Sequence, residues 1–346
     1  MKRFRITTIF LLAALLTALL APAAMAVADT KNERARAYPA SLTKVMTVLL
    51  AVEAVENGSV SLKDMVTAQP GFDFDMLIGG TTANIVAGET MSLENLLYCA
   101  MIASANEACN VIAQHISGSV SAFVDLMNRR AGELGCTDTN FVNTHGLPNA
   151  NHYTTAWDFS RILREAAGHD LFMKICSTLK YTVPDTNLSA ERRLENTNSL
   201  INPTNSLYPG DWGYEYARGV KTGHTSDAGY CLASTAEKDG VLLLSVVLNC
   251  QAFQQDDGSW YYGHFNDTRT LFRWAFDNYG YQEIVRSSEV VGEVAVEMGS
   301  DADTVSVRPS TTITAYLPND VDPASFERNV VLYPVQEGKP LMAPVE

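Results

Sequence analysis

The amino-acid sequence predicts an α/β (α+β) protein in which a helical cluster packs against a mainly antiparallel sheet, followed by a small all-β domain. Three observations favour this fold. Apolar residues recur at helical spacing through much of residues 42–167. An apolar run at 241–248 and a helical pattern at 268–279 then suit a strand and a helix that packs onto it. After residue 282, short alternating stretches separated by Gly, Pro, Asn and Asp are typical of β-hairpins.

The helical cluster is expected to hold five helices, because each segment carries a start or a stop signal. Ser92 and Thr155 occupy N-cap positions, and the first, third and fourth segments end at Gly58, Gly118 and Gly135. The predicted helices cover residues 42–55, 92–99, 106–116, 121–134 and 155–167.

Strands are expected at residues 181–183 and 241–248, and the continuous apolar character of the second suits a central position in the sheet. The helix at 268–279 should return onto that sheet. In the C-terminal part, the alternating stretches are 289–298, 304–307, 311–316 and 330–335. The predicted division is a signal peptide at 1–26, a main domain at 27–282 and an incomplete β-rich domain at 283–346.

The N-terminal stretch has the features of an export signal. Lys2, Arg3 and Arg5 precede an apolar run at 9–20, and a small-residue site, Ala24-Met25-Ala26, follows it. The alternative is an uncleaved membrane anchor, but the run is short for a full span. We therefore expect an exported protein on the extracytoplasmic side of a bacterial membrane.

The charge balance excludes one large class of partners. The chain carries 25 Lys and Arg against 39 Asp and Glu, which gives a formal net charge of −14. Nucleic-acid binding needs clustered cations that contact phosphates, so no nucleic-acid partner is expected. The same charge disfavours attraction to an anionic lipid surface.

Cysteine and histidine patterns give no sign of a metal or cofactor. The six Cys form no C-x-x-C motif, and several lie in apolar runs, so buried free thiols are expected, with one disulfide as the alternative. His145 and His152 are separated by a loop rich in Asn and Pro and lie outside any H-E-x-x-H motif. They are expected to be hydrogen-bonded structural residues.

Three short motifs carry the chemistry. Ser41-Leu-Thr-Lys44 opens the first helix, where positions i and i+3 share a face, so the hydroxyl and the amine can meet. Ser104-Ala-Asn106 precedes the third helix, and Lys221-Thr-Gly223 leads into His224. Each alone is explained by helix capping or by a turn glycine. In this order behind a signal peptide, the three together are improbable by chance.

The set matches the S-x-x-K, S-x-N and K-T-G motifs of penicillin-recognising serine hydrolases. The segment from Tyr38 to Thr47 closely resembles the nucleophile segment of serine-type D-alanyl-D-alanine carboxypeptidases, the low-molecular-mass penicillin-binding proteins. Residues 143–147, 152–156 and 196–198 are similar to connecting segments of that family. The resemblance covers about residues 37–280. It implies a β-lactamase/transpeptidase-like catalytic domain at 27–282 and a second, β-sandwich-like domain without catalytic residues.

The resemblance implies an enzyme without a cofactor that removes the terminal D-alanine from peptidoglycan pentapeptides through an acyl-enzyme. Its partners would be stem peptides ending in D-Ala-D-Ala, with β-lactams as covalent inhibitors, and its role would lie in cell-wall biogenesis and cell shape. Members often end in an amphipathic helix that binds the membrane peripherally, whereas residues 337–346 show no such helix.

The family's roles transfer to the matching positions. Ser41 would be the nucleophile and Lys44 the base, while Ser104 would pass a proton to the leaving amine and Asn106 would orient Lys44 and the substrate. The backbone N–H groups of Ser41 and His224 would form the oxyanion hole.

Recognition is assigned to the third motif. Lys221 and Thr222 would bind the terminal carboxylate, and Gly223 would allow close approach of the substrate backbone.

A second departure and two alternatives accompany the resemblance. Only residues 27–40 separate the signal from the nucleophile, so an edge hairpin of the sheet and some stability should be missing. A β-lactamase of the same fold is one alternative, but its deacylating Glu would have to be Glu191, too close before Lys221 for that class. A catalytically silent wall-binding protein is the other.

Overall fold

The structure, a computed structural model, describes residues 31–77, 80–295, 304–327 and 329–330. The predicted signal peptide, and most of the strand predicted at 330–335, lie outside these residues. Within the described part of the chain, none of the helices combines the length and apolarity needed to cross a bilayer.

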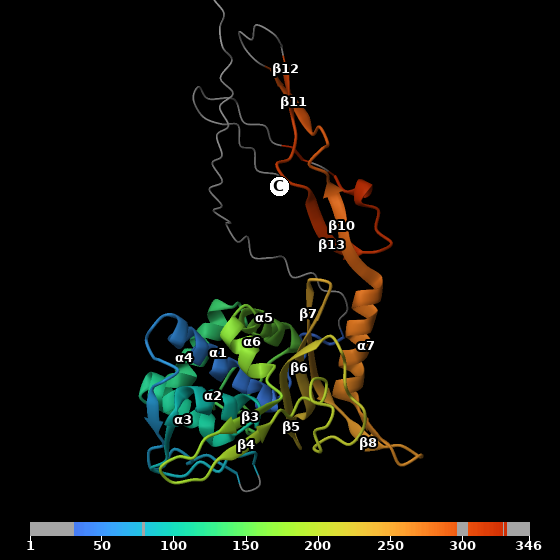
Figure 1. Cartoon of the computed structure of the whole chain (residues 1–346). Helices are drawn as coiled ribbons and strands as arrows, with labels where there is room; N and C mark the ends of the chain where they lie inside the picture. The colour runs from blue at the N-terminus through green and yellow to red at the C-terminus, as the bar shows by residue number, and fades with distance from the viewer. Residues whose placement is uncertain (1–30, 78–79, 296–303, 328, 331–346) are drawn as a thin grey trace, which may run out of the picture.

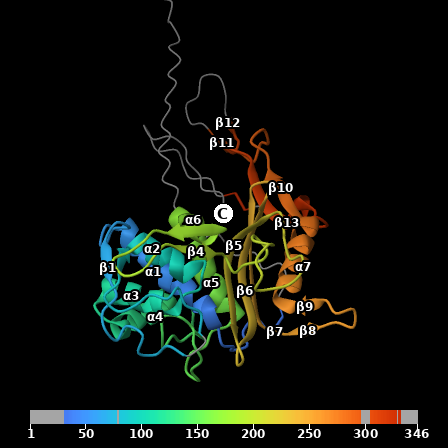
Figure 2. The same cartoon turned by 60° about the horizontal axis from the view of Figure 1, so that its bottom comes forward.

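A helical cluster lies on one side of a three-stranded antiparallel sheet, and one long helix covers the other face (Figures 1 and 2). The sheet order is β5 (Ala217–Thr225), β6 (Gly229–Lys238), β7 (Val241–Cys250), and the covering helix is α7 (Gly263–Asn278). Beyond α7 a narrow arm of β-strands rises away from the body (Figure 1). The predicted fold class is confirmed.

The five predicted helices are all present. Side chains of Ser92 and Thr155 accept hydrogen bonds from backbone N–H groups three residues on, as N-caps should. Gly118 closes its helix in the left-handed region, with φ of 76°. The observed helices are α1 (Thr43–Glu56), α2 (Leu93–Met101), α3 (Asn106–Ser117), α4 (Val120–Glu133) and α5 (Ala156–Ala167), and a sixth, α6 (Asp170–Cys176), was not predicted.

The main core explains why α1 is apolar all round. Residues 42–52 of the nucleophile segment are buried almost without exception, including polar Lys44 and Thr47. α1 contacts α2, α3, α4, α5 and α6, so no face of it meets solvent over this stretch. A central, fully enclosed helix gives its side chains fixed positions.

The prediction of a central position for residues 241–248 is wrong for the described part of the chain, where β7 pairs only with β6 and lies at the sheet edge. Its apolar character has another cause. α5 packs on one face of β7 and α7 on the other, so side chains on both faces are partly covered. The central strand is β6, which pairs with β5 and β7.

Short two-stranded ladders complete the body. They are β1 (Met65–Thr67) with β2 (Thr90–Ser92), β3 (Lys180–Val183) with β4 (Arg192–Glu195), and β8 (Ala252–Gln254) with β9 (Trp260–Tyr262). A buried ion pair, Arg192 to Glu89 at 2.6 Å, ties the β4 strand to the loop before β2.

The arm consists of β10 (Tyr279–Val285) paired with β13 (Ile313–Pro318), and β11 (Gly292–Ala295) paired with β12 (Thr304–Val307), with the 3-10 turn η2 (Pro323–Ser325) after β13. β10 starts directly at the end of α7 and crosses the boundary predicted after residue 282. The all-β character predicted for this region is present in the described residues.

All six cysteines are free thiols, and five of them are buried. Burial raises the pKa of the Cys231 thiol to about 11 and that of Cys109 to about 12, so both stay protonated at neutral pH. They behave as small apolar residues of the core.

Candidate active site

Ser41 lies on a single 3-10 turn, η1 (Ala40–Leu42), that leads into α1. Ala40 has φ of 47°, a left-handed conformation that is unfavourable for a residue with a Cβ. Its carbonyl accepts a hydrogen bond from Thr43 Oγ1 at 2.9 Å, and Thr43 Oγ1 lies 2.7 Å from His152 Nε2. The strained turn that presents Ser41 is therefore held by a buried chain of hydrogen bonds.

Lys44 is completely buried and lies at the centre of the site. Its Nζ atom is 2.8 Å from Ser41 Oγ, 2.8 Å from Asn106 Oδ1 and 2.8 Å from the carbonyl oxygen of His145. Burial lowers the pKa of Lys44 to about 8. At a pH slightly above the physiological value, Lys44 is therefore neutral in a large share of the molecules.

The three partners of Lys44 determine where its lone pair points when it is neutral. Asn106 Oδ1 and the His145 carbonyl oxygen can only accept hydrogen bonds, so they take the two N–H groups of the amine. The remaining lone pair is then directed at the Ser41 hydroxyl. This arrangement lets Lys44 receive the Ser41 proton without any rearrangement.

The second motif closes the site from the helical side. Ser104 is 5% exposed and has φ of 61°, so the loop between α2 and α3 is strained as well. Asn106 starts α3, and its backbone N–H donates to the Thr81 carbonyl at 3.0 Å. Glu107, the next residue of α3, fixes the segment that follows Thr81 by accepting hydrogen bonds from Thr82 Oγ1 and Ala83 N–H at 2.7 Å each.

The third motif lies on β5. Lys221 is 1% exposed, and the one acceptor that the described residues give it is the carbonyl oxygen of Thr222 at 2.9 Å. Burial, and next the charge of Lys44, lower the pKa of Lys221. Thr222 Oγ1 lies 2.7 Å from Thr197 Oγ1, which places the residues 196–198 segment beside the same strand. Lys221 is thus a buried amine with unused donors.

Gly223 sits where β5 passes the nucleophile turn. A Cβ on Gly223 would lie 3.1 Å from Ser41 N and 3.1 Å from the Pro39 carbonyl oxygen. The Ser41 N–H therefore lies directly against this part of the strand, next to His224. His224 is exposed, and its ring packs on Tyr230 with 4.1 Å between centroids. All three motifs converge on Ser41.

Sequence reasoning missed the buried residues that support this constellation. His145 Nε2 lies 3.0 Å from Asp75 Oδ2, and Asp75 Oδ1 accepts from Asn110 Nδ2 at 2.8 Å. Asn110 Oδ1 in turn accepts from Thr144 Oγ1 at 2.6 Å, and the Thr144 carbonyl accepts from Thr47 Oγ1. This network fixes the loop whose carbonyl binds Lys44. The one local sign of this network is that polar residues, Thr47 and Asn110, stand among apolar ones in their helices.

His145 and His152 are held by hydrogen bonds. The Leu147 N–H donates to His145 Nδ1, and the Val142 N–H donates to His152 Nδ1, so both rings carry their proton on Nε2. Burial lowers the pKa of His152 to about 3, so this ring is neutral.

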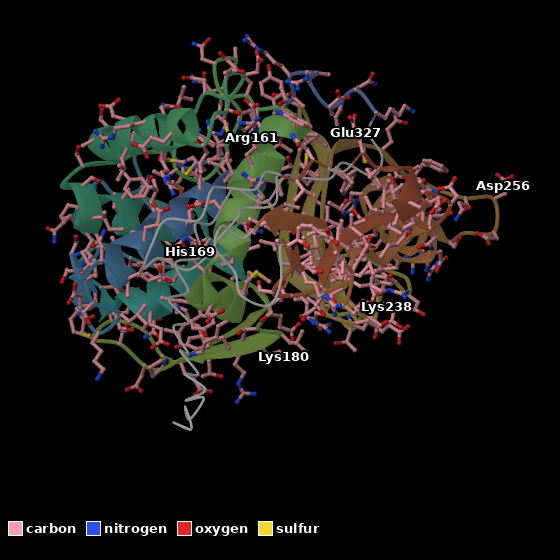
Figure 3. The ribbon with its side chains drawn as sticks, turned by 90° about the horizontal axis from the view of Figure 1, so that it is seen from above. Arg161, His169, Lys180, Lys238, Asp256 and Glu327 are labelled. Carbon is pink, nitrogen blue, oxygen red and sulfur yellow. The ribbon has the colours of Figure 1, made fainter. Side chains whose placement is uncertain are left out.

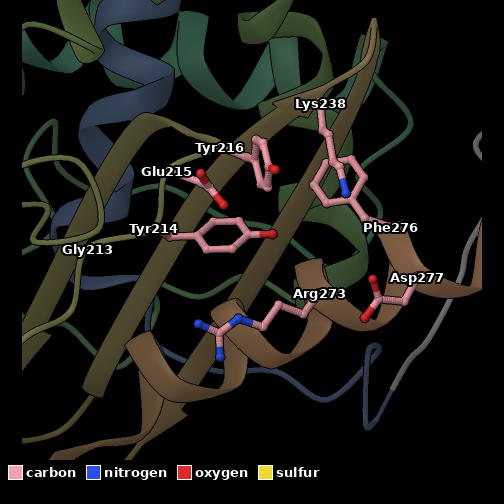
Figure 4. A pocket seen from close by; sticks show the side chains of 8 residues that line it. All are labelled: Gly213, Tyr214, Glu215, Tyr216, Lys238, Arg273, Phe276 and Asp277. Carbon is pink, nitrogen blue, oxygen red and sulfur yellow. The ribbon is translucent and has the colours of Figure 1, made fainter.

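Three other candidate features lie outside the site. Glu53, Glu165 and His169 gather at a surface cluster, but Arg130 already donates to both carboxylates there. Glu191, the residue considered for β-lactamase chemistry, pairs with Arg193 at the surface and is 55% exposed. A cavity of about 330 Å³ between the start of β5 and α7 contains none of the motif residues (Figure 4).

Comparisons with known proteins agree on one family. The family model described as D-alanyl-D-alanine carboxypeptidase matches residues 17–252. The D-alanyl-D-alanine carboxypeptidase DacF of Bacillus subtilis is 30% identical over 315 residues, which cover 90% of this chain and 75% of that protein. The carboxypeptidase DacA of Haemophilus influenzae is 28% identical over 280 residues, and the chain spans 64% of its length.

A solved structure shows the same arrangement in space. Penicillin binding protein 5 from Haemophilus influenzae superposes with a TM-score of 0.68 at 26% identity, and the match covers 89% of this chain and 83% of that one. The DD-transpeptidase of Streptomyces K15 matches with a TM-score of 0.61 at 25% identity, over 72% of this chain and 92% of its own.

Proposed function

The chain belongs to the D-alanyl-D-alanine carboxypeptidase family of serine peptidases, and we propose that Ser41 is the nucleophile with which it removes the terminal D-alanine from peptidoglycan stem peptides. The observation that carries this assignment is the 2.8 Å approach of Lys44 Nζ to Ser41 Oγ, with the two other Lys44 partners both acceptors. No cofactor takes part in the reaction so described.

Acylation begins when neutral Lys44 takes the Ser41 proton and Ser41 Oγ attacks the carbonyl carbon of the penultimate D-alanine. The developing oxyanion is stabilised by the backbone N–H groups of Ser41 and His224, next to Gly223. The C–N bond then breaks, and the leaving amine receives a proton through Ser104. Asn106 keeps Lys44 oriented throughout. Water hydrolyses the resulting ester and regenerates Ser41.

Lys221 provides the recognition that makes the enzyme an exopeptidase. The substrate ends in a carboxylate, and Lys221 is a buried amine with donors to spare beside Thr222. A carboxylate entering the site would raise the pKa of Lys221 again and favour its charged form. Thr222 adds a hydroxyl donor. The partner is therefore a peptide with a free D-alanine carboxylate, and strained β-lactams that mimic it would acylate Ser41.

The signal-like N-terminus and the substrate place this activity outside the cytoplasmic membrane, in cell-wall metabolism that affects cell shape. In this assignment residues 1–26 are a cleaved signal, residues 27 to about 282 are the catalytic domain, and the strands beyond form an accessory domain.

The test is covalent labelling combined with product analysis. A fluorescent penicillin should label the wild-type protein, and Ser41→Ala should lose the label while keeping its melting temperature. The wild type should release free D-alanine from a pentapeptide ending in D-Ala-D-Ala. Rapid turnover of a chromogenic cephalosporin without D-alanine release would favour a β-lactamase instead, and neither activity would favour a silent wall-binding protein.

A further inference from the structure

A second cavity, of about 530 Å³, lies outside the catalytic site, between the β8–β9 hairpin and the first half of α7. Three segments line it: the loop at 209–212, the hairpin at 255–261, and Asn266 and Arg269 of α7. We call this the aromatic groove and define it by Trp212, Trp260, Tyr261, Asn266 and Arg269.

The aromatic groove contains an aromatic ring that is largely exposed instead of being packed in the hydrophobic core. Trp260 is 40% exposed although one ring neighbour, Tyr262, stacks on it with 5.8 Å between centroids. Trp212 is buried in the same lining, and the Arg269 guanidinium lies over its ring at 5.4 Å. An exposed tryptophan and a buried one that line the same cavity offer apolar ring surface to a ligand.

Both sides of the groove are held rigid. Gly210 has φ of 132°, and a Cβ there would lie 2.7 Å from Trp212 Nε1, so the loop can wrap around the indole only with glycine. The indole N–H donates to the Pro209 carbonyl at 3.2 Å. A platform fixed in advance loses little conformational entropy on binding.

The hairpin tip opposite is cross-linked by its own side chains. Gln255 Nε2 donates to Ser259 Oγ at 3.0 Å, and Ser259 Oγ donates to Asp257 at 2.6 Å. The tip projects from the body, with Asp256 at its end (Figure 3).

The polar lining is mostly neutral and hydrogen-bonding. Gln255, Ser259 and Asn266 supply amides and a hydroxyl, and Arg269 donates to the Asp211 carbonyl at 3.1 Å. In the other cavity, Lys238 lies 5.1 Å from the centroid of the Tyr216 ring and 5.8 Å from that of Phe276 (Figure 4), as Arg269 lies over Trp212 here, whereas no cation of the described residues lies over the Trp260 ring. Rings plus neutral amides suit an uncharged ligand with an apolar face and several hydroxyls.

We propose that the aromatic groove binds an uncharged N-acetylated sugar of the glycan strand that carries the stem peptides, an inference that rests on the proposed function. The apolar face of the pyranose would stack on Trp260, and the amide side chains would bind its hydroxyl and acetamido groups. The groove is tied to the catalytic sheet, because the ring of Tyr208, next to Pro209, packs edge-on against that of Tyr230 on β6, with 6.4 Å between centroids. One loop would thus contact both the glycan and the sheet that carries the third motif.

The test uses a peptide-free tetramer of N-acetylglucosamine, titrated against the full protein by calorimetry and tryptophan fluorescence. We expect binding, and Trp260→Ala should weaken it by about tenfold or more. Trp274→Ala is the matched control, because Trp274 is 38% exposed on α7, the helix that carries Asn266 and Arg269, but lines neither cavity. This variant should bind the tetramer as the wild type does. On glycan-linked pentapeptide, Trp260→Ala should raise KM with little change in kcat.

Absence of tetramer binding in the wild type, or an equal loss in both tryptophan variants, would overturn the proposal. Lipid vesicles that bind in a Trp260-dependent way while the tetramer does not would overturn it in favour of a membrane contact. Penicillin labelling of the wild type reports the catalytic assignment separately. Tetramer binding without labelling would therefore remove the carboxypeptidase proposal and leave the sugar site standing.

Discussion

The two sides of the proposed active site hold one buried lysine each, and the two lysines have very different hydrogen-bond partners. On the helical side, Lys44 has three partners at 2.8 Å, and the loop that carries one of them, His145, is held by the buried network around Asp75. On the strand side, Lys221 is equally buried, yet the described residues offer it one backbone carbonyl. The hydrogen bonds of Lys44 are therefore all formed without substrate, whereas the Lys221 amine has N–H groups that can still donate to a substrate acceptor.

Under the proposed roles, this difference separates proton transfer on the helical side from substrate recognition on the strand side. Proton transfer needs a base whose geometry is settled in advance, and a network buried in the helical core provides it. Recognition needs an amine whose N–H groups lack acceptors until the substrate carboxylate binds to it. Variants on the helical side should therefore affect chemistry with every substrate, and variants of Lys221 should affect only substrates with a carboxylate.

The largest effect is expected from Lys44→Arg. The guanidinium keeps the positive charge but stays protonated at any working pH, so it cannot accept the Ser41 proton. The rate at which penicillin acylates Ser41 should fall by roughly 10³-fold, in line with the loss of a general base. The rate of penicillin acylation, followed by gel fluorescence, is the measurement. A near-wild-type rate would mean that another group serves as base.

Gly223→Ala should have the next largest effect. The new Cβ would lie 3.1 Å from Ser41 N and 3.2 Å from the Ala40 Cβ, so the strand and the nucleophile turn must move apart. A displacement of about 1 Å at reacting groups costs about 10²-fold in rate. Stopped-flow acylation measures it.

The matched control for that variant is Gly132→Ala on α4, where a Cβ meets nothing within 4 Å. This substitution should leave the acylation rate unchanged. Equal rates for the two glycine variants would contradict close packing of β5 against the nucleophile turn.

The pH dependence of acylation should show the state of Lys44. Its pKa is lowered to about 8, and the reactive form is the neutral one, so the rate should rise as pH increases through 8. Between pH 7 and pH 9 the neutral fraction, and with it the rate, should increase by about tenfold. A rate that falls over this interval would require a protonated Lys44 in the reactive state.

The helical side was also the more predictable from sequence. S-x-x-K on a helical pattern places Ser41 and Lys44 on one face, and caps such as Ser92 and Gly118 mark boundaries locally, so both could be inferred without tertiary information. The support beneath them could not. Asp75 and His145 are 70 residues apart, and Asn110 and Thr144 are 34 apart, so only the folded chain brings them together.

The position of β7 in the sheet could not be predicted from its residues alone. The apolar run of β7 predicts a central strand, because a strand covered on both faces is usually flanked by other strands. Here α5 and α7 supply the cover instead, and hydrophobicity alone cannot distinguish a strand between strands from an edge strand between helices. α6 was missed for a related reason, since its two turns are too short for a clear period.

The most direct test of the division between the two sides compares two pentapeptides that differ only in the terminal group, a free carboxylate or its amide. Lys221→Gln should lose about 10- to 100-fold in kcat/KM on the free acid, as expected when a charged hydrogen bond is removed. On the amide, the variant and the wild type should differ little, because no carboxylate is present to bind. An equal loss on both peptides would contradict the recognition role of Lys221 and make it part of the chemistry on the helical side.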